Sequence, residues 1–215
     1  MKWLDNQPSS SVVFLCFGSL GAFNEAQMKE IAVGLERSGH GFLWSVRRPA
    51  ETEAGTVSDY TNLEVEEVLP DGFLDRTAGR GLVCGWAPQV EILGHRATGD
   101  FVSHCGWNST LESLWFGVAM LAWPVYAEQK VNASVLVKEM GLAVDVGCLK
   151  RTETDGGDVV TAEDVERGIV SVMDSNNVVR ERVGEMKEKS RKAETDGGCS
   201  FASLQQLMDD VMESI

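Results

Sequence analysis

Residues 98–123, TGDFVSHCGWNSTLESLWFGVAMLAW, carry the pattern that decides the fold. The apolar run at 100–105 predicts a short buried strand, residues 108–117 a helix, and residues 119–125 another strand. Between the first strand and the helix stands a polar turn that contains histidine, glycine and asparagine. A strand end followed by such a turn and a helix start is where α/β folds hold anions and nucleotides.

The alternation of strand and helix continues on both sides of this stretch. Further strands are predicted at 10–19, 41–47, 81–86 and 142–147. Helices are predicted at 24–39, 88–95, 128–141, 161–174, 178–194 and 200–214. Six such alternations predict an α/β fold, a Rossmann-like doubly wound parallel sheet.

The composition narrows the class of protein. The chain has 215 residues, and its hydrophobic content of 43% is ample for a packed core. Its net charge of −14 argues against a nucleic acid or an anionic membrane surface as partner. The five cysteines include no Cys-x-x-Cys pair, which favours neither a zinc site nor a disulfide framework and indicates a reducing compartment. No apolar run approaches the roughly 18–20 residues of a membrane span, and residues 1–10 do not resemble a signal peptide. Together with the cysteines, this leads us to expect a cytoplasmic protein.

Four unusual peptides follow predicted strands, at 17–19, 85–89, 104–109 and 124–129. In an open parallel sheet the ligand binds beyond the carboxyl ends of the strands. These four peptides would therefore meet at one edge of the sheet, and we expect a ligand site there.

Trp86 and the residues after it allow two interpretations. Trp86 is either a core side chain or a flat surface on which a base stacks. Pro88 keeps Ala87 extended, which would present the backbone groups of Ala87 to the edge of a base.

The turn at 104–109 has the features of an anion site. His104 is a donor, Gly106 lets a ligand approach the backbone, and Asn108 and Ser109 stand at the expected helix start. The alternative is that Ser109 and Glu112 form a capping box, which would make both structural. Asn108 and Glu112 are four residues apart on one helix face, which suits one contact to phosphate and one to ribose.

Glu128 and Gln129 open a predicted helix, where an acidic residue is ordinary, although both side chains also suit sugar hydroxyls. The spacing leaves both interpretations open. No Gly-x-Gly-x-x-Gly follows the first strand, and the chain has no Walker A sequence and no Asp-x-Asp pair. These absences disfavour a dinucleotide-binding dehydrogenase, a P-loop nucleotidase and a metal-dependent sugar transferase.

Residues 86–129, from WAPQVEIL to PVYAEQ, span 44 residues and resemble the signature box of the plant UDP-dependent glycosyltransferases of secondary metabolism. The stretch WLDNQPSSSVVFLCFGS at 3–19 resembles the entry into the C-terminal domain of that family. The resemblance implies a GT-B architecture of two facing Rossmann-like domains. The C-terminal one binds the UDP-sugar and the N-terminal one binds the acceptor.

The resemblance also implies roles for single residues. Trp86 would stack on uracil, with Ala87 contacting it through the backbone, and Gln89 and Glu112 would bind the ribose. The expected diphosphate contacts are Ser19, His104, Asn108 and Ser109, and the expected sugar contacts are Trp107, Glu128 and Gln129. A glutamine at position 129 is associated in the family with glucose donors. Asp100 and Ala119 depart from the usual box, which has glycine and proline there.

The catalytic histidine of the family, a general base, lies near the N-terminus of the full enzyme, and none of the three histidines here matches it. We therefore expect residues 1–215 to be the donor-binding domain of an inverting, metal-independent glucosyltransferase that acts on a small molecule such as a flavonoid. The N-terminal acceptor domain, and with it the catalytic residue, would be absent from this chain. UDP-glucose would be its substrate, no cofactor is expected, and the chain alone would be inactive. The alternative is a standalone nucleotide-sugar-binding module.

Overall fold

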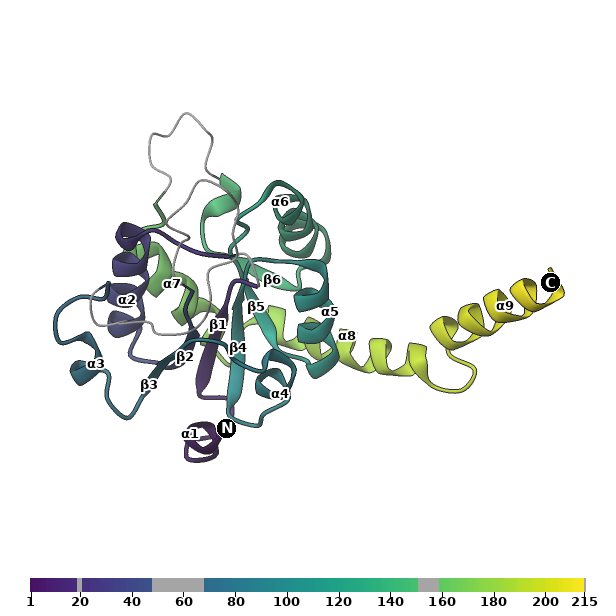
Figure 1. Ribbon diagram of the computed structural model, residues 1–215, viewed down its shortest axis with the longest axis horizontal. Helices are drawn as coiled ribbons and strands as arrows, with labels where there is room; N and C mark the ends of the chain where they lie inside the picture. The colour runs from purple at the N-terminus through teal and green to yellow at the C-terminus, as the bar shows by residue number, and fades with distance from the viewer. Residues whose placement is uncertain (19–20, 48–67, 151–158, 215) are drawn as a thin grey trace.

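The computed structural model describes residues 1–18, 21–47, 68–150 and 159–214. Within these ranges six parallel strands form one sheet in the order β3-β2-β1-β4-β5-β6 (Figure 1). The strands are β1 (Val12–Cys16), β2 (Gly41–Ser45), β3 (Gly81–Cys84), β4 (Thr98–Ser103), β5 (Ala119–Ala122) and β6 (Ala143–Asp145). The predicted doubly wound parallel sheet is confirmed, with each expected strand present.

Helices lie on both sides of the sheet (Figure 1). They are α1 (Lys2–Asp5), α2 (Glu25–Ser38), α3 (Phe73–Arg76), α4 (Gln89–Leu93), α5 (Trp107–Phe116), α6 (Ala127–Ser134), α7 (Ala162–Met173), α8 (Val178–Glu194) and α9 (Cys199–Glu213). The predicted helix at 128–141 is α6 continued by a π-helical turn, η2 (Val135–Met140), and a short 3₁₀ turn, η3 (Cys148–Lys150), follows β6. Helix α2 packs against α7, and α5 packs against α8.

The apolar runs of the sequence form the central strands because these are covered on both faces. Residues 12–15 of β1 and all residues of β4 and β5 are buried. The rings of Phe14 and Phe101 stack at 5.3 Å between neighbouring strands β1 and β4. The edge strand β3 is only half buried.

Local sequence signals fix several helix ends. The side chain of Asn24 accepts a hydrogen bond from the backbone N–H of Gln27 and caps α2. Gly39 and Gly141 end their helices in the left-handed conformation that glycine adopts at little cost. These caps set where each helix begins or ends, and therefore the length of the loop that joins the helix to the neighbouring strand.

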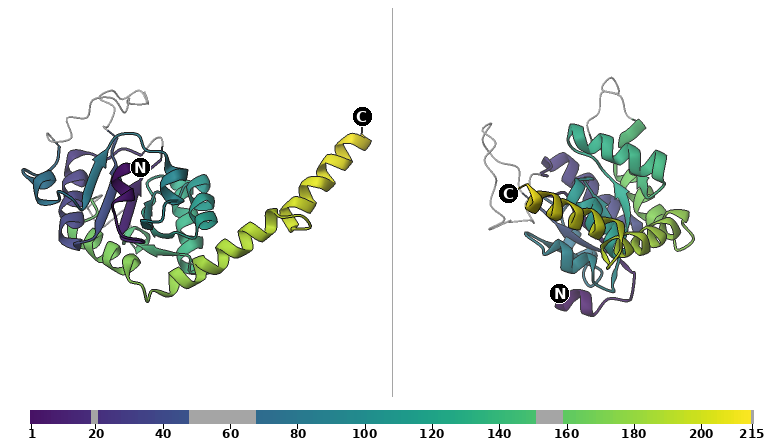
Figure 2. Two further views of the ribbon diagram at one scale, coloured as in Figure 1. Left: turned by 90° about the horizontal axis from the view of Figure 1, so that it is seen from below. Right: turned by 90° about the vertical axis from the view of Figure 1, so that its right-hand side faces the viewer.

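Helix α9 stands away from the rest of the described chain (Figure 2). None of its residues is buried, and an apolar row that includes Phe201, Leu204 and Val211 faces solvent. No helix in the described ranges is both long and apolar enough to cross a membrane.

Candidate ligand-binding site

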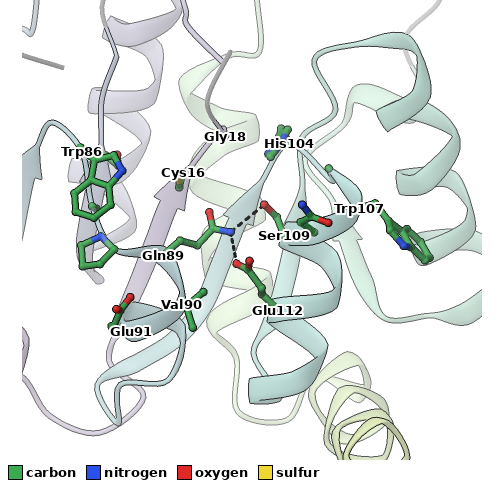
Figure 3. Close-up of a pocket in the computed structure, with 15 residues that line it drawn as sticks. Cys16, Gly18, Trp86, Gln89, Val90, Glu91, His104, Trp107, Ser109 and Glu112 are labelled. Carbon is green, nitrogen blue, oxygen red and sulfur yellow. Dashed lines mark hydrogen bonds between the residues drawn. The ribbon is translucent and has the colours of Figure 1, made fainter. Parts of the chain in front are cut away.

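A pocket of about 630 Å³ lies at the carboxyl ends of the strands (Figure 3). It is lined by the ends of β1 and β2, the turn after β3, and the starts of α4 and α5. The strand order reverses between β1 and β4, and this switch point is where open α/β sheets bind ligands. The topology therefore places the pocket where the sequence predicts a ligand site.

Most of the residues expected to bind the donor line this one pocket. They are Trp86, Ala87, Gln89, His104, Gly106, Trp107, Asn108, Ser109 and Glu112. Ser19 lies outside the described residues. Glu128 and Gln129 are not among the lining residues, the first being exposed and the second buried.

Trp86 and Trp107 lie at opposite ends of the pocket (Figure 3). Trp86 is 66% exposed and Trp107 is 61% exposed. The interpretation of Trp86 as a core side chain is therefore wrong, and its ring is available as a stacking surface. Pro88, just before α4, has an extended backbone, and Ala87 before it is half-buried in the pocket wall.

The amide of Gln89 connects α4 to α5 (Figure 3). Its Nε2 donates to Oγ of Ser109 at 3.0 Å and to Oε2 of Glu112 at 2.7 Å. The capping box considered as the alternative for Ser109 and Glu112 is absent, because the N-cap of α5 is Gly106, three residues before Ser109, and the helix begins at Trp107. The carboxylate and the amide are thus held together on the pocket wall.

His104 is confined by two glycines. A Cβ atom at Gly18 would lie 2.6 Å from Nε2 of His104, and one at Gly106 would lie 2.4 Å from the same atom. Cys105, between His104 and Gly106 in the chain, has a positive φ of 62°, and its carbonyl accepts a hydrogen bond from Nδ2 of Asn132 at 3.0 Å. The turn that carries His104 is therefore tied to α6, and the ring is fixed beside the N-terminus of α5.

The charge of His104 follows from its burial. Burial lowers the pKa of His104, and the nearby Glu128 carboxylate acts in the opposite direction without cancelling this effect. A neutral ring has one N–H donor and one acceptor nitrogen. Among the described atoms, Nδ1 of His104 is buried without a hydrogen-bond partner. Because no side chain caps α5, the N–H groups of its first turn also face the pocket unbonded by a cap.

Gln129 acts in the structure of α6. Its Oε1 accepts hydrogen bonds from the backbone N–H groups of Val125 and Tyr126, at 3.0 and 2.9 Å. This reciprocal cap orders the turn between β5 and α6. The exposed Glu128 lies near enough to His104 to influence its pKa.

The sequence did not single out some residues that line the pocket. Cys16 and Ser45 come from the ends of β1 and β2, whereas Gly18, which also lines the pocket, belongs to the predicted peptide 17–19. Burial raises the pKa of Cys16, which keeps it a neutral thiol, and Oγ of Ser45 donates to the carbonyl of Gly85 at 2.7 Å. Their position at strand ends was the available signal. In the described ranges, no cluster of three or more His, Cys, Asp or Glu side chains has the arrangement of a metal site.

Comparison with known proteins identifies the family. The family model described as UDP-glucoronosyl and UDP-glucosyl transferase matches residues 2–178. UDP-glycosyltransferase 71A15 from Malus domestica is 60% identical over 212 residues, which cover 98% of this chain and 44% of the relative. The chain belongs to the plant UDP-glycosyltransferases.

Solved structures of this family share the fold. A ugt transferase from Siraitia grosvenorii in complex with UDP matches with a TM-score of 0.90 and 55% identity, over 98% of this chain and 45% of that one. UGT71G1 from Medicago truncatula complexed with UDP-glucose matches with a TM-score of 0.83 and 50% identity, over 98% of this chain and 42% of that one. The expected fold, the C-terminal half of a GT-B glycosyltransferase, is thus confirmed. The chain spans less than half the length of these relatives.

Proposed function

We propose that residues 1–215 form the UDP-sugar-binding domain of a glucosyltransferase, with the signature box at 86–129 as its donor site. The observation that carries this proposal is the gathering of nine expected donor contacts in one pocket at the switch point of the sheet. The structures of the Siraitia and Medicago relatives with UDP and UDP-glucose support it.

The geometry supports a division of the pocket into three parts. The exposed ring of Trp86 would stack on uracil, with the backbone of Ala87 at the edge of the base. The pair of Gln89 and Glu112, already hydrogen bonded, would take the two ribose hydroxyls. Trp86, Ala87 and Gln89 belong to α4 or the turn before it, and Glu112 meets Gln89 from α5. This leaves the N-terminus of α5 for the charged part of the ligand.

The diphosphate would lie at the N-terminus of α5. Free N–H groups there, together with the side chains of His104, Asn108 and Ser109, offer donors to the oxygens of the diphosphate without a metal ion. The proposed transferase is therefore metal-independent. Ser19 and Trp107 would complete the contacts to diphosphate and sugar. Glu128, exposed near His104, would contact the sugar directly, and Gln129 would contribute from its place in the cap of α6.

The transfer step would need a base from outside this chain. His104 lines the pocket but is assigned to the diphosphate, whereas His40 follows α2 and His95 is hydrogen bonded to Asp5. We propose that an acceptor domain outside these 215 residues supplies the base and binds a small-molecule hydroxyl, such as that of a flavonoid. This would give transfer with inversion. The flavonoid glucosyltransferase of Fragaria ananassa, 54% identical over 214 residues, supports this acceptor class.

Calorimetric titration of UDP, UDP-glucose and UDP-galactose into this chain tests the proposal. We expect saturable binding of UDP and UDP-glucose at one site, lost or much weakened in Trp86→Ala and in His104→Ala. A stacked base contributes about 1–3 kcal/mol, so Trp86→Ala should weaken UDP binding by roughly 5- to 150-fold. Phe201→Ala on α9 and His40→Ala are the matched controls, since neither residue lines the pocket.

The outcomes separate the parts of the proposal. Absence of binding to all three ligands would contradict the donor-site assignment. Equal affinity for UDP-glucose and UDP-galactose would contradict the glucose preference alone. Formation of a flavonoid glucoside by this chain alone, measured by chromatography, would show that the base lies within these 215 residues.

A further inference from the structure

A second pocket, of about 410 Å³, lies at the amino ends of the strands, whereas the donor pocket lies at their carboxyl ends. It is lined by residues at the amino ends of β1, β4 and β5, by the ends of α4 and α5, and by α8. Helices α4, α5 and α8 lie on the same side of the sheet (Figure 1). None of its lining residues also lines the first pocket, so the two sites are separate.

The charge of this second pocket is opposite to that of the protein. Four of the 19 Lys and Arg residues line it, and no Asp or Glu is among the described lining residues, although the chain has 33 of them and a net charge of −14. The four cations are Arg96, Arg180, Lys187 and Arg191.

The three arginines are held in place by contacts with the protein. Arg180 pairs with the buried Asp100 and donates to the carbonyl of Val172. Nε of Arg191 donates to the carbonyl of Trp115, whose ring centroid lies 5.4 Å from the guanidinium carbon. Each guanidinium carries five N–H donors, so these contacts leave donors free.

Lys187 and Arg96 complete the set. A Cβ at Gly117 would lie 2.7 Å from Cδ of Lys187, so the stem of this lysine lies directly over Gly117. In the part of the chain that the structure describes, the ammonium of Lys187 makes no hydrogen bond or ion pair. Arg96 donates one hydrogen bond, to the carbonyl of Asp5 at 3.0 Å.

The nearby negative groups do not cancel these cations. Asp100 offsets at most one positive charge from behind Arg180, and Asp5, bonded to His95, offsets at most a second. The carboxyl ends of α4 and α5 together contribute about one further negative charge. At least about one of the four positive charges remains uncompensated, and the four residues line one concave space.

We propose that this pocket binds a small anion that carries two or more phosphate groups. Guanidinium groups match phosphate oxygens in charge and geometry, and three fixed arginines with one unpaired lysine provide more donors than a single carboxylate uses. The concave shape and the volume of about 410 Å³ suit a small molecule.

The test uses tripolyphosphate as the probe, titrated calorimetrically into this chain at low and at 0.3 M salt. We expect one equivalent to bind at this pocket, with an affinity that falls as salt rises. Lys187→Ala should weaken this binding at least about tenfold, because a charge-assisted hydrogen bond is lost. Among the described residues, the side chain of Lys187 makes no polar contact that this variant would break, so the fold should be retained. Lys189→Ala removes the same charge from an exposed position on α8 and is the matched control.

His104→Ala distinguishes this pocket from the donor pocket. Binding that is weakened in Lys187→Ala but retained in Lys189→Ala and His104→Ala supports the proposal. Equal weakening in the two lysine variants would indicate attraction by overall charge and overturn it. Loss in His104→Ala alone would assign the probe to the donor pocket, and absence of binding to the unaltered chain would also overturn the proposal.

Discussion

Asp100 makes the stability of this protein depend on pH in an unusual direction. It lies in β4, fully buried, with Arg180 of α8 as its partner and with Oδ1 unbonded among the described atoms. Burial raises its pKa to about 7, because the favourable effect of Arg180 does not offset the loss of solvent. The native state therefore binds a proton that the unfolded chain, with a pKa of 3.8, has released.

The direction follows from proton linkage. Between about pH 4 and pH 7 the native state holds more protons than the unfolded state, so the free energy of unfolding falls as the pH rises through this window. Each pH unit corresponds to about 1.4 kcal/mol. From pH 5 to pH 8 the native carboxyl ionises near pH 7, so Asp100 should lower the free energy of unfolding by about 3 kcal/mol.

Asp100→Asn removes this contribution while keeping the size of the side chain. We expect the difference in unfolding free energy between variant and unaltered chain to shift by about 3 kcal/mol in favour of the variant between pH 5 and pH 8. Urea unfolding followed by tryptophan fluorescence at several pH values measures it, and Asp75→Asn, at an exposed site, is the matched control. Other titrating groups, including His40 near Arg180, are common to both proteins and largely cancel. Parallel pH profiles for the variant and the unaltered chain would refute the reasoning.

Three further predictions concern the donor pocket and α9. Gly106→Ala should abolish UDP binding, because the new Cβ would lie 2.4 Å from Nε2 of His104 and displace the ring. The backbone at this position (φ −61°) accepts alanine, so circular dichroism should show a retained fold. Gly184→Ala, which has open space around the added Cβ, is the control and should bind UDP normally. Glu112→Gln should weaken UDP about tenfold or more but leave 2′,3′-dideoxyuridine diphosphate nearly unaffected, since the lost contact is to ribose; equal weakening of both would contradict this role. Deletion of residues 199–215 should change the midpoint of thermal unfolding by less than about 2 °C, because α9 buries none of its residues, and a larger fall would show that α9 packs on the domain.

The sequence predicted the sheet because its strands are apolar runs whose burial on both faces is visible in the residues themselves. Val12–Leu15 is entirely apolar, and it is the centre of the sheet. The predicted site followed from one rule of geometry, that loops after parallel strands converge, and the box residues gather as that rule requires. Helix ends marked by Asn24 and Gly39 were also readable from local chemistry.

Other features depended on partners distant in the sequence or on backbone angles. The partner of Asp100 stands 80 residues further along the chain, and nothing near Asp100 predicts it. The start of α5 depends on the extended backbone of Gly106, and for this reason the capping box expected at Ser109 does not form. Gln129 suits a sugar hydroxyl by its chemistry, yet the structure uses its oxygen to cap α6.

The two glycines beside His104 have a consequence for the entropy of binding. An exposed side chain that becomes ordered by a ligand loses about 0.5–1.5 kcal/mol of rotational freedom. The imidazole of His104 lies so close to Gly18 and Gly106 that neither position has room for a Cβ atom, and this close packing restricts the ring when the turn folds. A ligand that reaches His104 therefore meets a preorganised side chain, and less of the free energy of that contact is spent on ordering it.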